Sequence, residues 1–355
     1  MTAPPPTEPL GDRVEQAIEA HTAVETEAAP PRRLGRTIFW LALTGISIYL
    51  VFPSIVEVFG SWRQITRFSL LSLAAMLGLQ VASLACMWAL QFVALRGPRW
   101  RAVITSQLAG NALAKVAPGG GAVGGALQYK LLVRAGASPA ATVTALAAVN
   151  VLVFAMVLAM PVLAIPALIR GGVNESLAHT AFAGLGVFVA ATALGALLLS
   201  TNGPLRWTGR QLQRVRNRLR RRSEPLHKLP DRLLRERDRL LATLGPRWKR
   251  ALLATVGRWT FDYLTLLAAL AAIGSHPRPG LVLLAFCGAQ VLAQIPITPG
   301  GLGFVEAGLS AMLALAGVSA GDALLATFAY RLFSYWLPLP IGLAAFALAP
   351  GGKEP

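Results

Sequence analysis

Two apolar stretches of the chain are interrupted near their centres, one by APGGG at residues 117–121 and the other by TPGGL at residues 298–302. Proline removes a backbone donor from a helix, and glycine permits backbone shapes that other residues avoid. Each segment is therefore expected to break a helix and to leave backbone groups unpaired. Inside a membrane, such groups are tolerated only where protein buries them or a polar cavity solvates them. The stretches, about residues 102–138 and 280–316, are each long enough for two short helices. This length predicts a re-entrant hairpin, with a kinked span or a tight loop as the alternative.

The composition indicates that lipid is the solvent. Of 355 residues, 55% are hydrophobic and 14% charged, with a mean hydropathy of +0.57, whereas a soluble chain carries about 25% charged residues. Six further apolar runs are long enough, at about 1.5 Å per residue, to cross about 30 Å of hydrocarbon. They are about Thr37–Phe59, Leu70–Leu95, Pro139–Ile169, Thr180–Ser200, Ala251–Ile273 and Asp322–Leu348. The expected fold is an all-α integral membrane protein with about six full transmembrane helices and two re-entrant or broken helical elements.

The two interrupted stretches are related by an internal repeat. A shift of 181 residues aligns Pro118, Gly119 and Gly120 with Pro299, Gly300 and Gly301, and the same shift aligns Ala135, Gly136 and Ser138 with Ala316, Gly317 and Ser319. Three full spans are expected between the two breaks, so the breaks would enter the membrane from opposite faces. That arrangement is an inverted repeat, as in transporters whose discontinuous helices meet near the bilayer midplane.

The basic charge is concentrated in one segment. Residues 201–250 hold 16 basic and 4 acidic side chains, which is +12 of the net charge of +17. A segment of this kind between apolar spans is typical of a cytoplasmic loop that touches anionic headgroups. Nucleic acid is the weaker alternative, because no nucleic-acid-binding motif is present.

The positive-inside rule predicts that both termini lie in the cytoplasm. The domain boundaries that we expect are a disordered tail at 1–36, a first membrane repeat at 37–200, the basic loop at 201–250, a second membrane repeat at 251–349 and a short tail at 350–355.

Charged side chains inside apolar segments cost about 2.5–3.5 kcal/mol each and are therefore candidates for function. Arg258 and Asp262 are four residues apart on one helix face. They are either a mutually neutralising structural pair, or a phosphate contact oriented by a carboxylate. Glu306 follows the second break, and Arg331 lies beside Tyr330 in the last span. These residues could pair or line a cavity, with Arg331 suited to phosphate and Glu306 to a coupling proton.

Further polar candidates flank the breaks. Lys115 precedes Pro118 and either meets a headgroup or extends to the cytoplasmic edge. Gln290 and Gln294 share a helix face before the second break and either join helices or contact substrate. Thr298, with the backbone amides of Gly300 and Gly301, could form an anion-binding nest.

No metal, cofactor or catalytic pattern is evident in the sequence. The histidines, His21, His179, His227 and His276, are scattered over tails, loops and span edges, and Cys86 and Cys287 lie within apolar runs. Motifs for a nucleophile elbow, a nucleotide-binding loop and a zinc protease are absent. We therefore expect neither a metal nor a cofactor, and no enzymatic activity. Movement of a ligand would be facilitated or ion-coupled.

The segment IPITPGGLGFVEAGLSAMLALAGVSAGDALLATFAYRLFSYWLPLPIG, residues 295–342, resembles the flippase-like membrane domain family, also called the lysylphosphatidylglycerol synthase transmembrane region. TPGGLGFVEAG, the AGVS turn and YRLFSYWLPL match in order. GNALAKVAPGGGAVGG and LLVRAGAS resemble its N-terminal half, so that the resemblance covers roughly residues 37–350. The family pattern implies that the functional residues include Pro118, Gly119, Gly120, Pro299, Gly300, Gly301, Glu306 and Arg331.

The resemblance implies lipid handling. In bifunctional relatives this domain moves aminoacylated phosphatidylglycerol across the bacterial membrane, and a separate soluble domain makes that lipid. This chain ends at Pro355, so we expect no synthase domain. The expected function is binding and translocation of an anionic phospholipid or related lipid. Two alternatives are a membrane enzyme acting on a lipid or polyprenyl phosphate, and a scaffold for a membrane-associated synthase or glycosyltransferase.

Overall fold

The computed structural model describes residues 68–95, 97, 99–117, 120–164, 175–219, 229–294 and 299–347. Several sequence predictions fall outside these residues. They are the tail at 1–36, the first span at Thr37–Phe59, Pro118, Gly119, Thr298 and the tail at 350–355.

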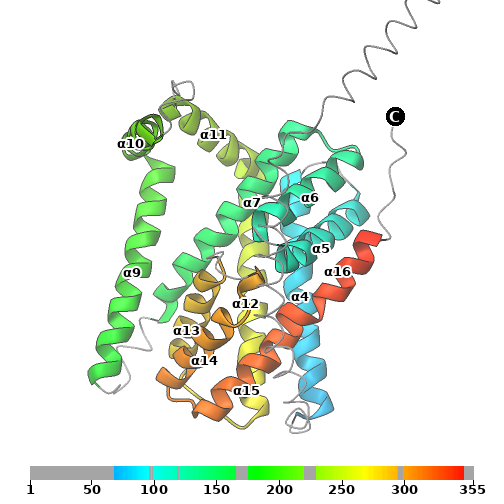
Figure 1. The fold of residues 1–355 in the computed structure, drawn as a ribbon, viewed down its shortest axis with the longest axis vertical. Helices are drawn as coiled ribbons and strands as arrows, with labels where there is room; N and C mark the ends of the chain where they lie inside the picture. The colour runs from blue at the N-terminus through cyan, green and yellow to red at the C-terminus, as the bar shows by residue number, and fades with distance from the viewer. Residues whose placement is uncertain are drawn as a thin grey trace, which may run out of the picture. The chain divides into compact units, whose positions relative to one another are not determined.

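The described residues are helical, and no β-strand occurs among them (Figure 1). In the first half the elements are α4 (Leu70–Leu95), α5 (Trp100–Val116), α6 (Gly120–Arg134), α7 (Pro139–Ala159) with the 3-10 turn η1 (Met160–Ala164), and α9 (Glu175–Ser200). The basic segment, which was predicted as a loop, contains α10 (Asn202–Leu219), α11 (Leu229–Leu244) and the 3-10 turn η2 (Gly245–Arg247). The second half consists of α12 (Trp248–Ala272), α13 (Pro279–Leu292), η3 (Pro299–Gly301), α14 (Phe304–Leu315), α15 (Ala320–Arg331), the π-helical segment η4 (Leu332–Trp336) and α16 (Pro338–Ala347).

Several of these helices are apolar enough for a membrane. Leu70–Leu95 and Pro139–Leu163 are each long and apolar enough to cross a bilayer. A third candidate combines Leu185–Leu197 with Asn202–Arg214, which are bent by 98° at the junction of α9 and α10. The described part of the chain is thus confirmed as helical, with apolar helices of membrane length, while the number of spans stays a prediction.

Both Pro-Gly-Gly segments interrupt helices, as predicted. In the first half, α5 ends at Val116 and α6 begins at Gly120, which has a positive φ of 48°. In the second half, α13 ends at Leu292, and Gly300 and Gly301 have φ values of 62° and 71° before α14 begins. The helices on the two sides of each break pack against each other, α5 on α6 and α13 on α14. This pairing favours a helical hairpin over a kinked span at each break.

Small residues allow α5 and α6 to pack closely. A Cβ added to Gly124 would clash with the carbonyl oxygen of Gly110 and lie 2.6 Å from Cβ of Ala114. Between α16 and α5, a Cβ on Gly342 would likewise clash with the carbonyl of Leu108. Glycine at such contacts lets backbones approach, as is common where lipid supplies no hydrophobic force between helices.

The order of elements repeats at the offset found in the sequence. The shift of 181 residues carries α4, α5, α6 and α7 onto α12, α13, α14 and α15. The turns that follow α6 and α14 have the same backbone, with φ of 91° at Gly136 and 92° at Gly317. In each turn this glycine donates to the residue three before it, and the next residue donates to the one five before it. Such a pattern is a Schellman-type helix end, which favours glycine at the left-handed position.

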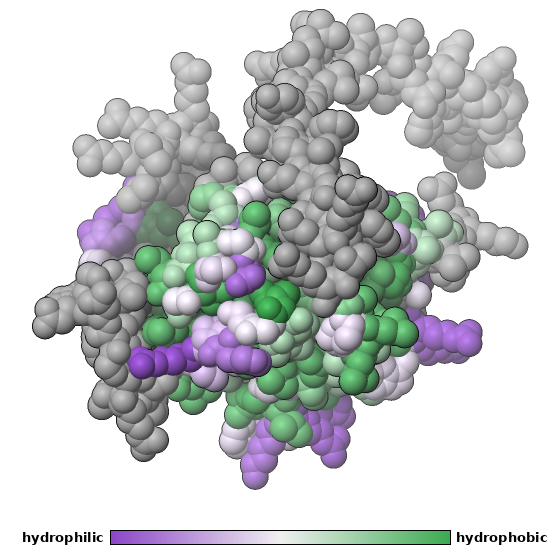
Figure 2. All heavy atoms as spheres, turned by 90° about the horizontal axis from the view of Figure 1, so that it is seen from below, coloured by the Kyte–Doolittle hydropathy of each residue, from purple (hydrophilic) through white to green (hydrophobic). Residues whose placement is uncertain are grey.

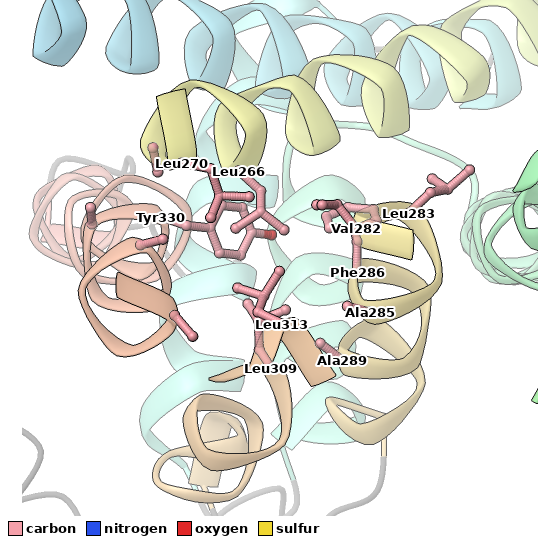
Figure 3. Packing of buried hydrophobic residues seen from close by; sticks show 14 of the residues in the cluster. Leu266, Leu270, Val282, Leu283, Ala285, Phe286, Ala289, Leu309, Leu313 and Tyr330 are labelled. Carbon is pink, nitrogen blue, oxygen red and sulfur yellow. The ribbon is translucent and has the colours of Figure 1, made fainter. Parts of the chain in front are cut away.

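The two halves join along α4 and α12, which pack closely through Gly257 against Cys86. One apolar core is formed mostly by α12 to α15 and centres on Phe286, whose ring makes edge contacts with Trp259, Tyr263 and Tyr330. Figure 3 shows leucines of α12 and α14 around Tyr330 in this core. A second, smaller core lies between α4, α5, α6 and α7.

The surface remains rich in apolar side chains. Leu70, Leu71 and Leu253 are exposed by 84%, 81% and 74%. Figure 2, which views the molecule of Figure 1 from below, shows hydrophobic side chains over much of the described surface on that side. Exposed apolar area on this scale is unusual for a soluble protein and is expected for helices that contact lipid.

The close approach of α5 and α6 makes a stability prediction. Gly124→Ala should lower the free energy of unfolding by about 1–3 kcal/mol, because the new methyl group overlaps the α5 backbone. Gly125→Ala is the matched control, since nothing lies within 4 Å of its added Cβ. Thermal unfolding in detergent, followed by tryptophan fluorescence, would measure both. Equal melting temperatures for the two variants would contradict the packing of α5 on α6.

Candidate functional site

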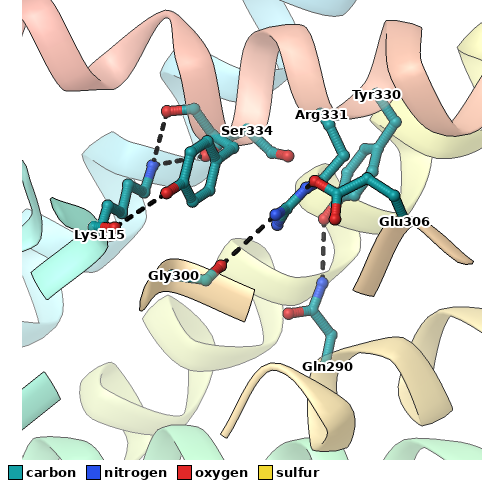
Figure 4. A network of polar contacts seen from close by, with 8 residues as sticks. Lys115, Gln290, Gly300, Glu306, Tyr330, Arg331 and Ser334 are labelled. Atoms are coloured by element: carbon teal, nitrogen blue, oxygen red, sulfur yellow. Dashed lines mark hydrogen bonds and ion pairs between the residues drawn. The ribbon is translucent and has the colours of Figure 1, made fainter. Parts of the chain in front are cut away.

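Polar side chains from both halves meet in the interior, next to the second break (Figure 4). We call this group the polar cluster. It consists of Lys115 from α5, Arg258 and Asp262 from α12, Gln290 from α13, Glu306 from α14, Tyr330 and Arg331 from α15 and Tyr335 from η4.

A buried ion pair forms the centre of the cluster. Nε of Arg331 donates to Oε1 of Glu306 at 2.7 Å, and the two residues are only 7% and 5% exposed. Nη2 of Arg331 also donates to the carbonyl of Gly300 at 3.4 Å, and the guanidinium lies 4.3 Å from the centre of the Tyr335 ring. Glu306 lies in the first turn of α14 and Arg331 in the last turn of α15. At both positions the helix dipole favours the charge that is present.

Lys115 ties the first half to the last helices. Its ammonium donates to the carbonyls of Ser334 and Tyr335, at 3.0 and 2.9 Å. The segment 332–336 is π-helical, and Pro338 and Pro340 follow it without backbone N–H groups. Because these prolines cannot donate back to the preceding turn, carbonyls there need another partner. Lys115 provides it, rather than extending to the membrane edge.

Gly300 packs against both Lys115 and Tyr335. Its positive φ of 62° favours glycine, and an added Cβ would lie 2.8 Å from the carbonyl oxygen of Lys115 and clash with Tyr335. That same carbonyl accepts a hydrogen bond of 3.0 Å from the Tyr335 hydroxyl. The second break therefore packs against the chain two residues before the first break.

A second hydrogen-bonded chain passes through Tyr330. Nε2 of Gln290 donates to the Tyr330 hydroxyl at 2.9 Å, and that hydroxyl donates to Oδ1 of Asp262 at 3.2 Å. Gln80 on α4 also makes a side-chain hydrogen bond with Asp262, which is 5% exposed. Asp262 is thus held by uncharged donors.

Arg258 is the cation with a free donor. No ion pair joins it to Asp262 in the described structure, although the two interact electrostatically. Its guanidinium lies 4.1 Å from the centre of the Trp259 ring, and its Nη1 is buried with no hydrogen-bond partner. A buried donor without a partner costs about 1–3 kcal/mol, and more when it is charged.

Other buried oxygens also lack partners in the described structure. These atoms are Oε1 of Gln80, Oε2 of Glu306, Oγ of Ser310 and Oγ1 of Thr327. Ser310 is one turn beyond Glu306 on α14, and Thr327 is one turn before Arg331 on α15. Because α14 and α15 pack together across a short turn, unsatisfied polar atoms border the ion pair on the side of the turn.

The remaining predicted residues lie around the cluster or away from it. Gly120 and Gly301 have positive φ and shape the two breaks, and Pro299 begins η3. Gln294 is exposed beyond the end of α13, so the face that it shares with Gln290 does not bring it to Tyr330. Pro118, Gly119 and Thr298 lie outside the described residues.

Sequence reasoning missed Tyr335, Ser334 and Gln80. The position of Tyr335, four residues after Arg331 in YRLFSYW, could have placed both residues on one helix face. Ser334 takes part through its backbone, so its side chain gives no signal. Gln80 is one of two glutamines on α4, and nothing in the sequence singles it out.

In chemical terms the cluster favours an anion. Lys115 interacts electrostatically with Arg331, Asp262 and Arg258. Three cationic and two carboxylate side chains meet here, which leaves one positive charge in excess when all are ionised. Among the described residues, no group of three or more histidine, cysteine or carboxylate side chains could hold a metal ion.

Fold and site together define a helical membrane protein with an interior polar cluster that contains three cationic side chains. The chain belongs to the family described as the lysylphosphatidylglycerol synthase TM region, whose profile matches residues 21–342. A UPF0104 membrane protein of Methanothermobacter thermautotrophicus is 31% identical over 91 residues, which is 26% of this chain and 26% of that relative. The match thus spans about a quarter of the relative's length. The family resemblance drawn from the sequence motifs is confirmed.

The buried ion pair gives a prediction about stability. Glu306→Gln or Arg331→Met alone should lower the free energy of unfolding by about 3–5 kcal/mol, because each leaves its partner buried without an opposite charge. The double variant should lose less than the sum, with a coupling of about 0.5–3 kcal/mol. Unfolding in mixed micelles would measure all three.

Asp238→Asn is the control, because Asp238 pairs with Arg237 but its side chain is 63% exposed. Its effect should stay below about 1 kcal/mol. Additive effects of the two single changes at Glu306 and Arg331 would contradict direct pairing.

Proposed function

We propose that the protein binds the headgroup of an anionic phospholipid, or a related anionic lipid, in the polar cluster and moves that lipid across the membrane. Family membership and the membrane-length helices support a role with membrane lipids. The net positive charge of the polar cluster, in which Lys115 and Arg258 are half-buried, supports an anionic ligand. The protein acts in this proposal as a transporter in a bacterial plasma membrane, with both termini in the cytoplasm, and not as an enzyme.

The observation that carries the proposal is the free Nη1 of Arg258. Arg331 is neutralised by Glu306, and Lys115 is occupied by two carbonyls. Arg258 alone among these cations has a buried donor without a partner. Because a guanidinium binds phosphate through a planar fork of N–H groups, Arg258 is the first phosphate contact in our proposal, and Arg331 is a second contact only when Glu306 releases it.

The architecture that we propose has six full spans and two re-entrant hairpins in an inverted repeat. The equivalent order of α4 to α7 and α12 to α15 supports the repeat, and the pairing of helices at each break supports the hairpins. In transporters of this design, discontinuous helices meet at the substrate site. The contact between Gly300 and the Lys115 carbonyl supports such a meeting point here.

Entry of a headgroup requires the cluster to open. Asp262, Glu306 and Arg331 are each at most 7% exposed, so a lipid must part some of the contacts that seal them. The bonds from Lys115 to Ser334 and Tyr335 join the two halves and can break without unfolding a helix. We propose that they act as the gate.

The test is lipid scrambling by the purified protein in liposomes, with headgroup-labelled anionic and zwitterionic lipids. Arg258→Gln should slow movement of the anionic lipid by at least about tenfold, because a charge-assisted hydrogen bond contributes about 1.5–3 kcal/mol. Arg278→Gln, at an exposed position before α13, is the matched control and should leave the rate unchanged.

Other outcomes would distinguish lipid transport at Arg258 from the alternative functions. Movement that is indifferent to Arg258 would place the site elsewhere. Absence of movement for every lipid tested, from protein shown to be folded, would contradict transport. Turnover of a labelled lipid to a new product would favour a membrane enzyme instead.

A further inference from the structure

The transport proposal does not use α10 and α11, although they hold much of the positive charge. Helix α10 turns by 98° from α9. Figure 1 shows α9 upright at the left and α10 almost end-on above it. Only Thr201 lies between the two helices, and one residue spans at most about 3.6 Å. If α9 crosses the membrane, α10 must therefore begin within the headgroup region and run along it.

Contacts from α11 fix the corner between α9 and α10. Nη1 of Arg237 on α11 donates to the carbonyl of Thr201 at 3.3 Å, and its side chain is 12% exposed. Gly209 of α10 packs against α11, where an added Cβ would lie 2.9 Å from Cα of Pro230 and 3.1 Å from the Leu233 side chain. These contacts hold α10 across the end of α9.

The side chains of α10 match a membrane surface. Arg206, Arg210 and Arg214 recur every four residues and are exposed, so they form one stripe along the helix. Trp207 and Leu212 are both 57% exposed. At 3.6 residues per turn, Trp207 lies beside the arginine stripe and Leu212 lies on the opposite side of the helix. Arginines that bind phosphates, next to a tryptophan at the level of the headgroups, are typical of a helix at the membrane surface.

We propose that α10 lies in the plane of the membrane surface and that Arg206, Arg210 and Arg214 bind the phosphates of anionic phospholipids. The 98° turn and the single linking residue place the helix beside headgroups, and its charge is complementary to them. An acidic protein or a nucleic acid could also bind these arginines. The attachment of α10 to α9, however, keeps lipid headgroups next to the stripe, whereas it does not keep a soluble partner there. The proposal depends on α9 crossing the membrane, and not on lipid transport.

The experiment places a fluorophore on α10 in the full chain. The two cysteines, Cys86 and Cys287, are replaced by Ser and Ala, and Leu212→Cys supplies a single labelling site. The protein is reconstituted in phosphatidylcholine vesicles with or without phosphatidylglycerol, and quenching by nitroxide-labelled lipids is compared with quenching by aqueous iodide.

We expect lipid quenching to exceed iodide quenching, and to rise at least about twofold with phosphatidylglycerol. High salt or the triple change of Arg206, Arg210 and Arg214 to Gln should remove this rise, because both weaken phosphate contacts. The triple change to Lys keeps the charge and should preserve it. Thermal unfolding of both triple variants verifies folding.

Two results would overturn the proposal. A label that iodide reaches and lipid quenchers do not would place α10 in water and favour a soluble partner. Lipid quenching that ignores both phosphatidylglycerol and the arginines would show an apolar contact without anionic lipid binding.

Discussion

The structure depends on how it satisfies backbone groups that two Pro-Gly-Gly segments and two later prolines leave unpaired. In hydrocarbon no water is available to them, so partners must come from elsewhere in the chain. Lys115 donates to two carbonyls of the π-helical segment, Tyr335 donates back to the Lys115 carbonyl, and Arg331 donates to Gly300. These long-range bonds place the cationic groups of both halves side by side. The polar cluster thus results from the hydrogen bonds that satisfy these backbone groups.

Charge imposes a second constraint on the same region. A buried pair such as Glu306 and Arg331 adds little stability over an apolar pair, whereas loss of one partner is costly. Glu306 and Arg331 therefore neutralise each other, and they are two of the five charged side chains of the polar cluster. Asp262 is satisfied by neutral donors, and Lys115 by carbonyls. Arg258 keeps a buried donor without a partner, and this donor is the one to which we assign the anionic headgroup in our proposal.

Local patterns predicted the helical breaks, the position of α4 and the family. They also paired Glu306 with Arg331 as one of two alternatives. The contacts of Lys115 were not predictable, because its partners lie 219 and 220 residues away and one acts through its backbone alone. Spacing placed Arg258 and Asp262 on one face, but could not show that tyrosine and glutamine satisfy the carboxylate. Composition marked the basic segment without revealing that it folds into two helices.

The two halves are similar in the order of their helices and in one turn, but they differ in their polar side chains. The shift of 181 residues relates α4 to α12 and reproduces the turn at Gly136 in the turn at Gly317. The charged and hydroxyl-bearing residues of the second half have no charged counterparts in the first. Arg258, Asp262, Glu306, Tyr330 and Arg331 correspond to Leu77, Val81, Gly125, Val149 and Asn150. A duplicate set would place four more charges in hydrocarbon, at about 2.5–3.5 kcal/mol each. The second half thus supplies four of the five charged side chains of the polar cluster, and the first half supplies Lys115 and the uncharged Gln80.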